Sequence, residues 1–321
     1  MKSLTLNKTK WSAFLTKYGT VVFFFLICIG FTILRPESFF CFSNLITVLR
    51  QISILAILGA GLTMVMITNR IDLTIGYTTS AISVFAGAMM VHFGMDMWLA
   101  ALLSLCVGAL LGFISGCAVA LLGIPDFIAT LSIGFLISGF NQAYTKGHPI
   151  SNLPAEFSVF GKGSFLGIPV SVYLMFAFLM IIYIILNHTK FGRHVYAIGG
   201  NQEAAMMSGI NVKKNLLLTY VVSGVGCALG ALILSSKLQT CHPTGGDNYL
   251  MDALATVYVG ATAFKGGEPN VLGTFIGALI IGVLNNGLTL CNVAYYNQDI
   301  AKGAVIFLAV TITCIQRAKK K

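Results

Sequence analysis

The sequence predicts an all-α protein, built as a polytopic bundle of membrane-spanning helices. Of its 321 residues, 57% are hydrophobic and only 9% are charged, and the mean hydropathy is +0.87. A soluble domain carries about 25% charged residues. Several apolar runs also reach the roughly 20 residues that a helix needs to cross a bilayer. Because such spans consume nearly the whole chain, we expect no soluble domain of useful size.

About ten apolar segments are suited to form spans. The first follows Lys8, Lys10 and Lys17 and has no small-residue cleavage site after it, so we interpret it as an uncleaved span. The eighth is short enough to be re-entrant. The predicted spans are 19–35, 45–68, 74–93, 97–122, 127–144, 166–187, 215–236, 250–264, 271–290 and 299–316.

The distribution of Lys and Arg predicts the orientation. With the N-terminus inside, fourteen of the 20 basic residues fall on the cytoplasmic side and five outside, and Arg50 lies in a span. The positive-inside rule therefore places both termini in the cytoplasm, with a segment 1–18, a transmembrane domain 19–316 and a tail 317–321. Charge that gathers at the ends and in one loop does not predict a nucleic-acid partner.

Two glycine-rich segments resemble each other across the chain. "GALLGFISG" at 108–116 and "GALIIGVLNNG" at 277–287 lie five spans apart, so they would have opposite orientations in the membrane. An inverted 5+5 repeat produces this pattern. Chance similarity between helices rich in Gly, Leu and Ile produces it too, and both explanations stay open.

Glycines at helical spacing predict close helix packing. Small residues on one face let helix backbones approach each other in lipid. Such a face can form a seam between two subunits, or it can pack inside one bundle. The residues concerned are Gly108, Gly112, Gly116, Gly273 and Gly277.

The sequence lacks the motifs of common enzymes. It contains no G-x-S-x-G, no H-E-x-x-H and no G-x-x-x-x-G-K-[ST], and its Cys and His residues lack metal-ligand spacing. We therefore expect no catalytic site, metal or cofactor, and no ATP bound through such a loop.

Polar residues inside or beside the spans are candidates for a solute pathway. A charge at the centre of a bilayer costs about 2.5–3.5 kcal/mol, so such residues usually have a function. Amides and carboxylates can hydrogen-bond the hydroxyls of a sugar-like solute. They can also cap broken helices or tie helices together, and we favour this structural role for the two Asp, which adjoin turns or helix starts. The candidates are Asp72, Asn141, Gln142, Asp252, Asn285 and Asn286.

The predicted cytoplasmic loop 188–214 contains a short polar helix at 201–210. Asn201 is suited to cap it, Glu203 lies in its first turn and Gly209 can end it. The helix would lie on lipid headgroups or place an apolar knob in a groove of a partner, and two turns offer little area for lipid. Its other residues are Ala204, Ala205, Met206 and Met207, and we expect Met206, Met207 and Ile210 to share the apolar face.

Several segments resemble one known family. "NRIDLTIG", "PDFIATLSIGFLISG", "FGRHVYAIGGNQEAAMMSGINVKK", "MDALATVYVGATAFKGGEPNVLGTFIGALIIGVLNNGLTL" and "QDIAKGAVIFLAV" occur in this order, across about residues 45–315. They resemble the permease of ribose/xylose-type simple-sugar ABC importers of the bacterial inner membrane. The resemblance implies that 201–210 is a coupling helix, whose Glu203, Ala204, Ala205 and Gly209 match the EAA signature.

The resemblance also implies partners. They are a cytoplasmic ABC ATPase, an extracytoplasmic sugar-binding protein, and a second copy or a paralogous permease, all working in membrane lipid. Asn69 and Arg70 replace two glycines that are usual in the family, Leu250 replaces a frequent Glu, and "KGGEPN" replaces a basic turn. These departures leave the sugar open. An ion-coupled secondary carrier for a small polar solute is the alternative, and Asp72 or Asp252 would then bind the ion.

Overall fold

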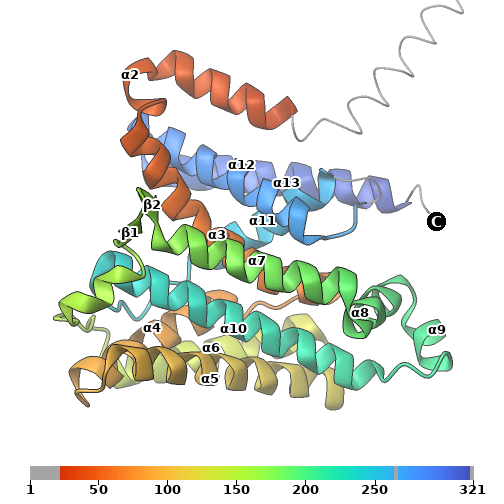
Figure 1. Cartoon of the computed structure of the whole chain (residues 1–321). Coiled ribbons are helices and arrows are strands. Elements are labelled where there is room, and N and C mark those ends of the chain that lie inside the picture. The colour runs from red at the N-terminus through yellow and green to blue at the C-terminus, as the bar shows by residue number, and fades with distance from the viewer. Residues whose placement is uncertain (1–21, 264–266, 319–321) are drawn as a thin grey trace, which may run out of the picture. The chain divides into compact units, whose positions relative to one another are not determined.

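The computed structural model describes residues 22–263 and 267–318. The chain forms two compact units (Figure 1). We call Leu49–Ala253 the central unit, and Met1–Val48 with Leu254–Lys321 the terminal unit. The predicted segment 1–18 lies outside the described residues, as do 319–321 of the predicted tail.

The described chain is mostly helical, which confirms the all-α prediction. A helix at Val22–Leu34 precedes the labelled elements. These are α2 Pro36–Phe39, α3 Phe42–Ile67, α4 Ile75–Val91, α5 Met97–Gly116, the π-helix η1 Cys117–Leu121, α6 Asp126–Thr145, the 3₁₀-helix η2 Ala155–Val159, β1 Ser164–Phe165, β2 Ile168–Pro169, α7 Val170–His188, α8 Lys190–Gly200, α9 Gln202–Met207, α10 Val212–Leu238, α11 Tyr249–Thr262, α12 Val271–Leu290 and α13 Tyr295–Ala318.

A helix lies at each of the ten predicted positions. Within the described residues, six are long and apolar enough to cross a membrane: α3, α5 with η1, α6, α7, α10 and α12. The helix at Val22–Leu34 and α4 are shorter apolar helices. The membrane bundle is therefore confirmed, while the count of ten spans stays a prediction.

Helix lengths recur in order along the chain. α3 and α10 have 26 and 27 residues, α4 and α11 have 17 and 14, and α5 and α12 have 20 each. α3 and α10 are each followed by a non-helical segment and then by the shorter helix α4 or α11. This order is compatible with the 5+5 repeat, which nevertheless stays a prediction.

The predicted start of the sixth span was wrong. Residues 166–169 belong to a hairpin in which Ser164 pairs with Pro169 and Phe165 with Ile168. Leu166 and Gly167 form its turn with φ of 50° and 78°, and a two-residue turn with both φ values positive matches the twist of the strands. α7 begins only after Pro169.

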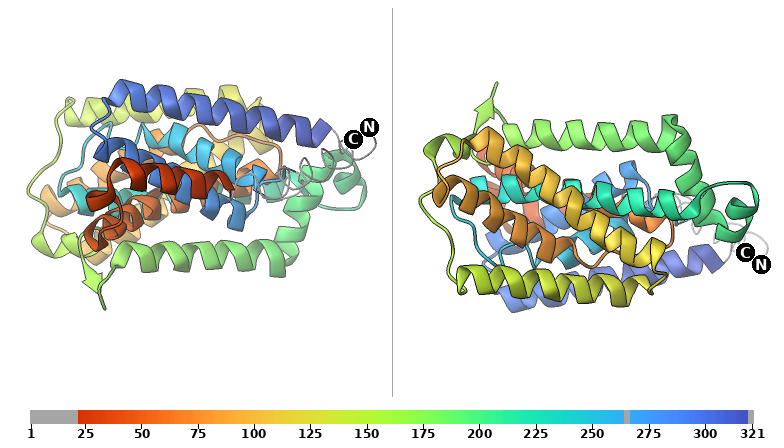
Figure 2. Two further views of the ribbon diagram at one scale, coloured as in Figure 1. Left: turned by 90° about the horizontal axis from the view of Figure 1, so that it is seen from above. Right: turned by 90° about the horizontal axis from the view of Figure 1, so that it is seen from below.

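α10 forms the core of the central unit. It packs along α5 and α4 (Figure 2), and buried residues lie on all of its faces. A Cβ on Gly108 would lie 2.5 Å from the carbonyl oxygen of Gly224, and one on Gly112 would overlap the carbonyl oxygen of Tyr220. Gly116 likewise lies against Leu217. In this structure, the glycine face of α5 thus packs inside the chain.

A similar contact occurs in the terminal unit. Gly273 lies against Gly260, and Gly277 lies against Thr256, so α12 meets α11 through glycines. Because lipid removes the hydrophobic drive between helices, such close backbone contact is a main source of their association.

We expect Gly112→Ala to destabilise the central unit by about 1–3 kcal/mol, because the added methyl group overpacks the contact with Tyr220. Gly139→Ala on α6 is the matched control, since no atom lies within 4 Å of its added Cβ. Denaturant unfolding of the purified protein in detergent measures both. Equal stability of the two variants would contradict the packing described.

Candidate functional site

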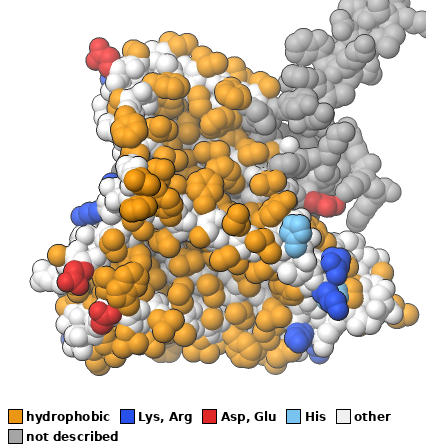
Figure 3. Space-filling view, viewed as in Figure 1, with side chains coloured by type: hydrophobic (Ala, Val, Ile, Leu, Met, Phe, Trp, Pro, Cys, Tyr) orange, Lys and Arg blue, Asp and Glu red, His pale blue; other side chains and the backbone are white. Residues whose placement is uncertain are grey.

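α8 and α9 form a polar cap on one end of the central unit, and the β1–β2 hairpin lies at the other end (Figures 1 and 2). Figure 3 shows Lys and Arg side chains gathered at the α8–α9 end. We call this the basic end. The basic residues of α8 and of the first turn of α10 are Lys190, Arg193, Lys213 and Lys214.

α8 is an element that sequence reasoning missed. The hydroxyl of Thr189 caps it by accepting a bond from the Gly192 N–H at 3.2 Å. Val195 and Ile198 are buried on its inner face. Their spacing of three residues, after a Thr cap, is a signal that could have predicted the helix.

α9 has the cap that the sequence predicts. The side-chain oxygen of Asn201 accepts a bond from the Ala204 N–H at 3.0 Å, and Glu203 lies in the first turn. Gly209 has φ of 80°, which is the left-handed conformation that commonly ends a helix. The N–H of Ile210 bonds to Ala205 O at 3.1 Å and that of Gly209 to Met206 O at 3.0 Å, which together form a Schellman motif.

The two faces of α9 differ sharply. Ala205 is buried against Ile198 and Val212, whereas Met206 and Met207 are 61% and 87% exposed. The expectation that Ile210 shares the exposed face was wrong. The Schellman motif folds Ile210 back onto the buried cluster, so the exposed apolar knob consists of Met206 and Met207.

The junction of α8 and α9 is attached to the segment 68–74 between α3 and α4. The Asn69 side chain donates to the Gly199 carbonyl oxygen at 2.5 Å, and Arg70 donates to the Gln202 side chain at 3.2 Å. Arg70 also lies 3.7 Å from Asp126 in an ion pair. A Cβ on Gly199 would overlap the carbonyl oxygen of Ile67, so the junction lies directly against the end of α3.

Asp72 organises this same segment from inside. It is 2% exposed. One carboxylate oxygen accepts bonds from the Thr74 N–H at 3.0 Å and the Thr74 hydroxyl at 2.6 Å, and the other accepts from the Ser223 hydroxyl at 2.8 Å. Asp72 therefore ties the start of α4 to α10.

Neighbouring side chains bond the remaining backbone groups of the segment. Asp126 accepts from the Ile71 N–H at 2.6 Å, Thr130 accepts from the Leu73 N–H at 3.1 Å, and Tyr220 donates to the Ile71 carbonyl oxygen at 3.1 Å. Sequence reasoning did not single out these side chains, since nothing local marks them.

The other pathway candidates lie in different places. Asn141 is buried and donates to the Pro243 carbonyl oxygen at 2.8 Å. Gln142 is exposed and bonds to Ser138 on its own helix. Asp252 is buried in the first turn of α11. The described hydrogen bonds tie Asp72 and Asn141 to different segments.

Two candidates belong to the terminal unit. Asn286 and Asn44 exchange amide bonds of 2.8 and 3.0 Å, and Asn44 also donates to Phe39 O. Asn285 is buried on α12, the helix that also contains Asn286. The reciprocal amide pair joins α12 to α3 and thereby gives Asn286 a structural partner that the sequence did not reveal.

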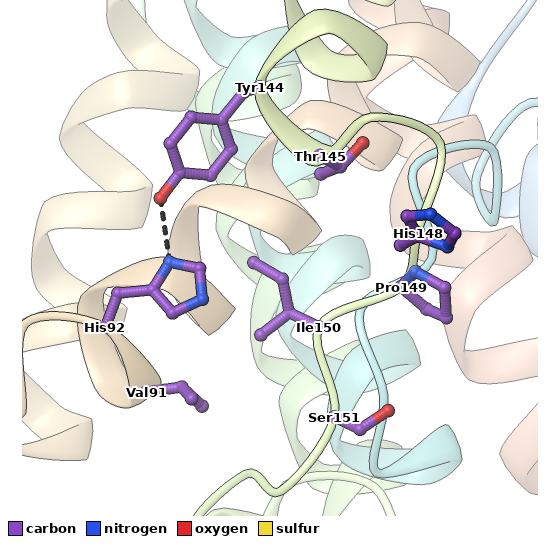
Figure 4. Close-up of a pocket in the computed structure, with 8 residues that line it drawn as sticks. All are labelled: Val91, His92, Tyr144, Thr145, His148, Pro149, Ile150 and Ser151. Carbon is purple, nitrogen blue, oxygen red and sulfur yellow. Dashed lines mark hydrogen bonds between the residues drawn. The ribbon is translucent and has the colours of Figure 1, made fainter.

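A pocket of about 250 Å³ opens at the hairpin end, where α4 and α6 finish (Figure 4). The His92 ring nitrogen and the Tyr144 hydroxyl are 2.9 Å apart on its wall. None of the predicted pathway residues lines it. The lining residues are Val91, His92, Tyr144, Thr145, His148, Pro149, Ile150 and Ser151.

The fold and this polar cap define a multi-pass membrane protein with an exposed helix anchored at one end. Residues 44–310 match the family model described as branched-chain amino acid transport system / permease component. The chain belongs to this family. Its matched range covers nearly all of the predicted spans.

Curated relatives specify the class further. The chain is 40% identical to the ribose import permease of Haemophilus influenzae over 89% of both chains, and 40% identical to that of Bacillus subtilis over 92% of both. It is 34% identical to the galactose/methyl galactoside import permease of Haemophilus influenzae over 100% of both. No solved structure matches the chain. The resemblance to permeases of simple-sugar ABC importers is confirmed, and with it a multi-pass protein of the bacterial inner membrane.

We expect Asn69→Gly to loosen the α8–α9 junction. Glycine removes the amide that bonds to Gly199 while tolerating the φ of 57°. Hydrogen exchange of backbone amides in 199–207 should become several-fold faster, since opening needs one bond fewer. Asn152→Gly, at φ of 63° in an exposed loop, is the control. Unchanged exchange in 199–207 would show that the Asn69 bond does not hold the junction.

Proposed function

We propose that the chain is the transmembrane subunit of an ATP-driven importer that carries a monosaccharide. The support is the agreement among relatives, which are import permeases for ribose, for galactose or methyl galactoside, and for D-allose. Each is a simple sugar or its simple glycoside. The proposal therefore names a substrate class, and the individual sugar stays open.

Under this proposal, α9 couples the permease to a separate ATPase, and one observation supports this role. The knob of Met206 and Met207 projects from a helix that is otherwise fixed by Ala205, by the Asn201 cap and by the bonds from Asn69 and Arg70. A firmly held helix with exposed apolar side chains at its tip is suited to dock into a groove on a partner protein. A helix of six residues has little area to hold onto lipid.

Orientation and assembly follow from the same proposal. The basic end faces the cytoplasm and its ATPase, and by the positive-inside rule the proposal assigns both termini to the cytoplasm as well. An extracytoplasmic sugar-binding protein delivers the solute at the hairpin end. A second copy or a paralogous permease completes the pathway between the subunits.

The polar candidates take different roles under this proposal. Asp72 holds the break before α4, since Thr74 and Ser223 already bond to its carboxylate. Asn141 positions the segment that contains Pro243. The ion-coupled carrier would need a carboxylate for its ion, and no contact of Asp72 favours that use. Gln142, Asp252, Asn285 and Asn286 remain candidates for the pathway.

We expect uptake of a labelled monosaccharide into vesicles only when the cognate ATPase and ATP are present. D-ribose, D-galactose and D-allose are the probes. An ATP-driven importer has no use for an ion gradient, so a gradient alone should drive no uptake. Uptake with a proton or sodium gradient and without ATP would overturn the proposal in favour of the secondary carrier.

We expect Met207→Glu to weaken co-purification of the ATPase by at least tenfold, because the charge must lose its water on entering an apolar groove. Leu166→Glu is the control, since Leu166 is 83% exposed at the hairpin end. Uptake driven by ATP should fall in parallel for Met207→Glu. Normal capture of the ATPase by this variant would exclude α9 as the docking helix.

A further inference from the structure

The segment 239–248 between α10 and α11 runs back along α4 instead of staying at the hairpin end. It begins beside Gly87, where Cys241 and Ile150 exchange backbone bonds of 2.9 and 3.0 Å. It reaches the first turns of α4, where the Gly246 N–H bonds to the Ser80 hydroxyl at 2.8 Å.

The segment therefore enters the depth of the membrane. The Ser83 and Ser235 hydroxyls are 2.7 Å apart, so these residues lie level on α4 and α10. Gly76 precedes Ser83 by about two turns and lies roughly 10 Å deeper at 1.5 Å per residue. That depth matches about residue 228 of α10, close to the middle of this 27-residue helix. The segment meets α4 there, since a Cβ on Gly246 would lie 2.7 Å from Gly76 O.

Hydrogen bonds from two helices fix the segment along its length. On α4, the Ser80 hydroxyl donates to the Asp247 carboxylate at 2.6 Å. On α6, the Asn141 amide donates to the Pro243 carbonyl oxygen at 2.8 Å. Non-helical backbone at membrane depth is tolerated only where it is buried in protein or lines a cavity that contains water.

The side chains of the segment separate into two sets. Cys241, Pro243 and Gly246 are buried against the helices, whereas His242, Thr244 and Asn248 are exposed. The His242 ring and the Thr244 hydroxyl are 3.2 Å apart. His242 follows Cys241 at the level of Gly87, near the hairpin end, whereas Asn248 follows Gly246 at the level of Gly76. A polar side chain exposed at that depth would be costly in hydrocarbon, so Asn248 faces water or another protein surface.

We propose that His242, Thr244 and Asn248 line the water-filled part of the translocation pathway and exchange hydrogen bonds with the hydroxyls of the passing sugar. This inference rests on the proposed function and adds the contact surface to it. A hydroxyl, an imidazole and an amide supply both donors and acceptors, which matches a polyhydroxylated solute. Asn141 and Ser80 position the segment and do not contact the sugar.

The first test measures exposure to water. Thr244→Cys and Asn248→Cys are made in the full-length protein in membrane vesicles and treated with a charged methanethiosulfonate reagent. The control is Leu110→Cys, which is 56% exposed near the middle of α5, and the unmodified chain gives the background of native cysteines. We expect both variants to react at least tenfold faster than the control. Rates equal to the control would show that the segment does not line water, and would overturn the inference.

The second test measures contact with the solute in the assembled importer, with labelled D-ribose, D-galactose and D-allose as probes. Asn248→Ala should reduce ATP-driven uptake of the accepted sugar at least fivefold while capture of the ATPase is unchanged. Uptake equal to that of the unmodified complex would overturn the contact. Reagent labelling needs no transport, so failure of the unmodified complex to import any sugar would count against the proposed function alone.

Discussion

Backbone that leaves a helix inside a bilayer has no water to bond to, and this constraint governs the central unit. The chain departs from helical structure before α4, and it does so again before α11. Side chains from other helices bond both departures: Asp126, Thr130 and Tyr220 bond the segment 68–74, together with its own Asp72, whereas Ser80 and Asn141 bond the later segment. The position of α9 depends on the first of these breaks through Asn69 and Arg70.

Close packing of α10 against α5 and α3 holds in place the side chains that bond to the non-helical segment before α4. Tyr220 illustrates the link, because its hydroxyl bonds to Ile71 while its backbone lies against Gly112 of α5. Ser223, one turn further on, bonds to Asp72 and lies against Gly61 of α3. A larger residue on the glycine face of α5 would displace α10. The Tyr220 and Ser223 hydroxyls of α10 would then move away from the groups to which they bond in the segment before α4. The buried hydrogen bonds of this unit therefore depend on the small residues that let its helices pack closely.

Much of the fold could be predicted because helices that cross lipid need long apolar runs, which are easily recognised in a sequence. Apolar runs located a helix at all ten expected positions, and the capping preferences of Asn201 and Gly209 located α9. Errors occurred where local backbone geometry decided the outcome. The type of turn at Leu166 and Gly167 displaced the start of α7, and the Schellman motif turned Ile210 inward. Of the site, the knob of Met206 and Met207 was foreseen, whereas its attachment to Asn69 and Arg70 was not.

By itself, the sequence determined the class of protein, the helical architecture and the family, since hydropathy, charge and motifs are local properties. Tertiary structure alone decided which polar groups meet. Asp72 and Ser223 are 151 residues apart, and Asn44 and Asn286 are 242 apart, yet each pair forms hydrogen bonds. No local pattern encodes such partners, because they are chosen by the way that helices stack. The return of residues 239–248 to the depth of α4 is likewise a result of packing, since in sequence they read as an ordinary loop.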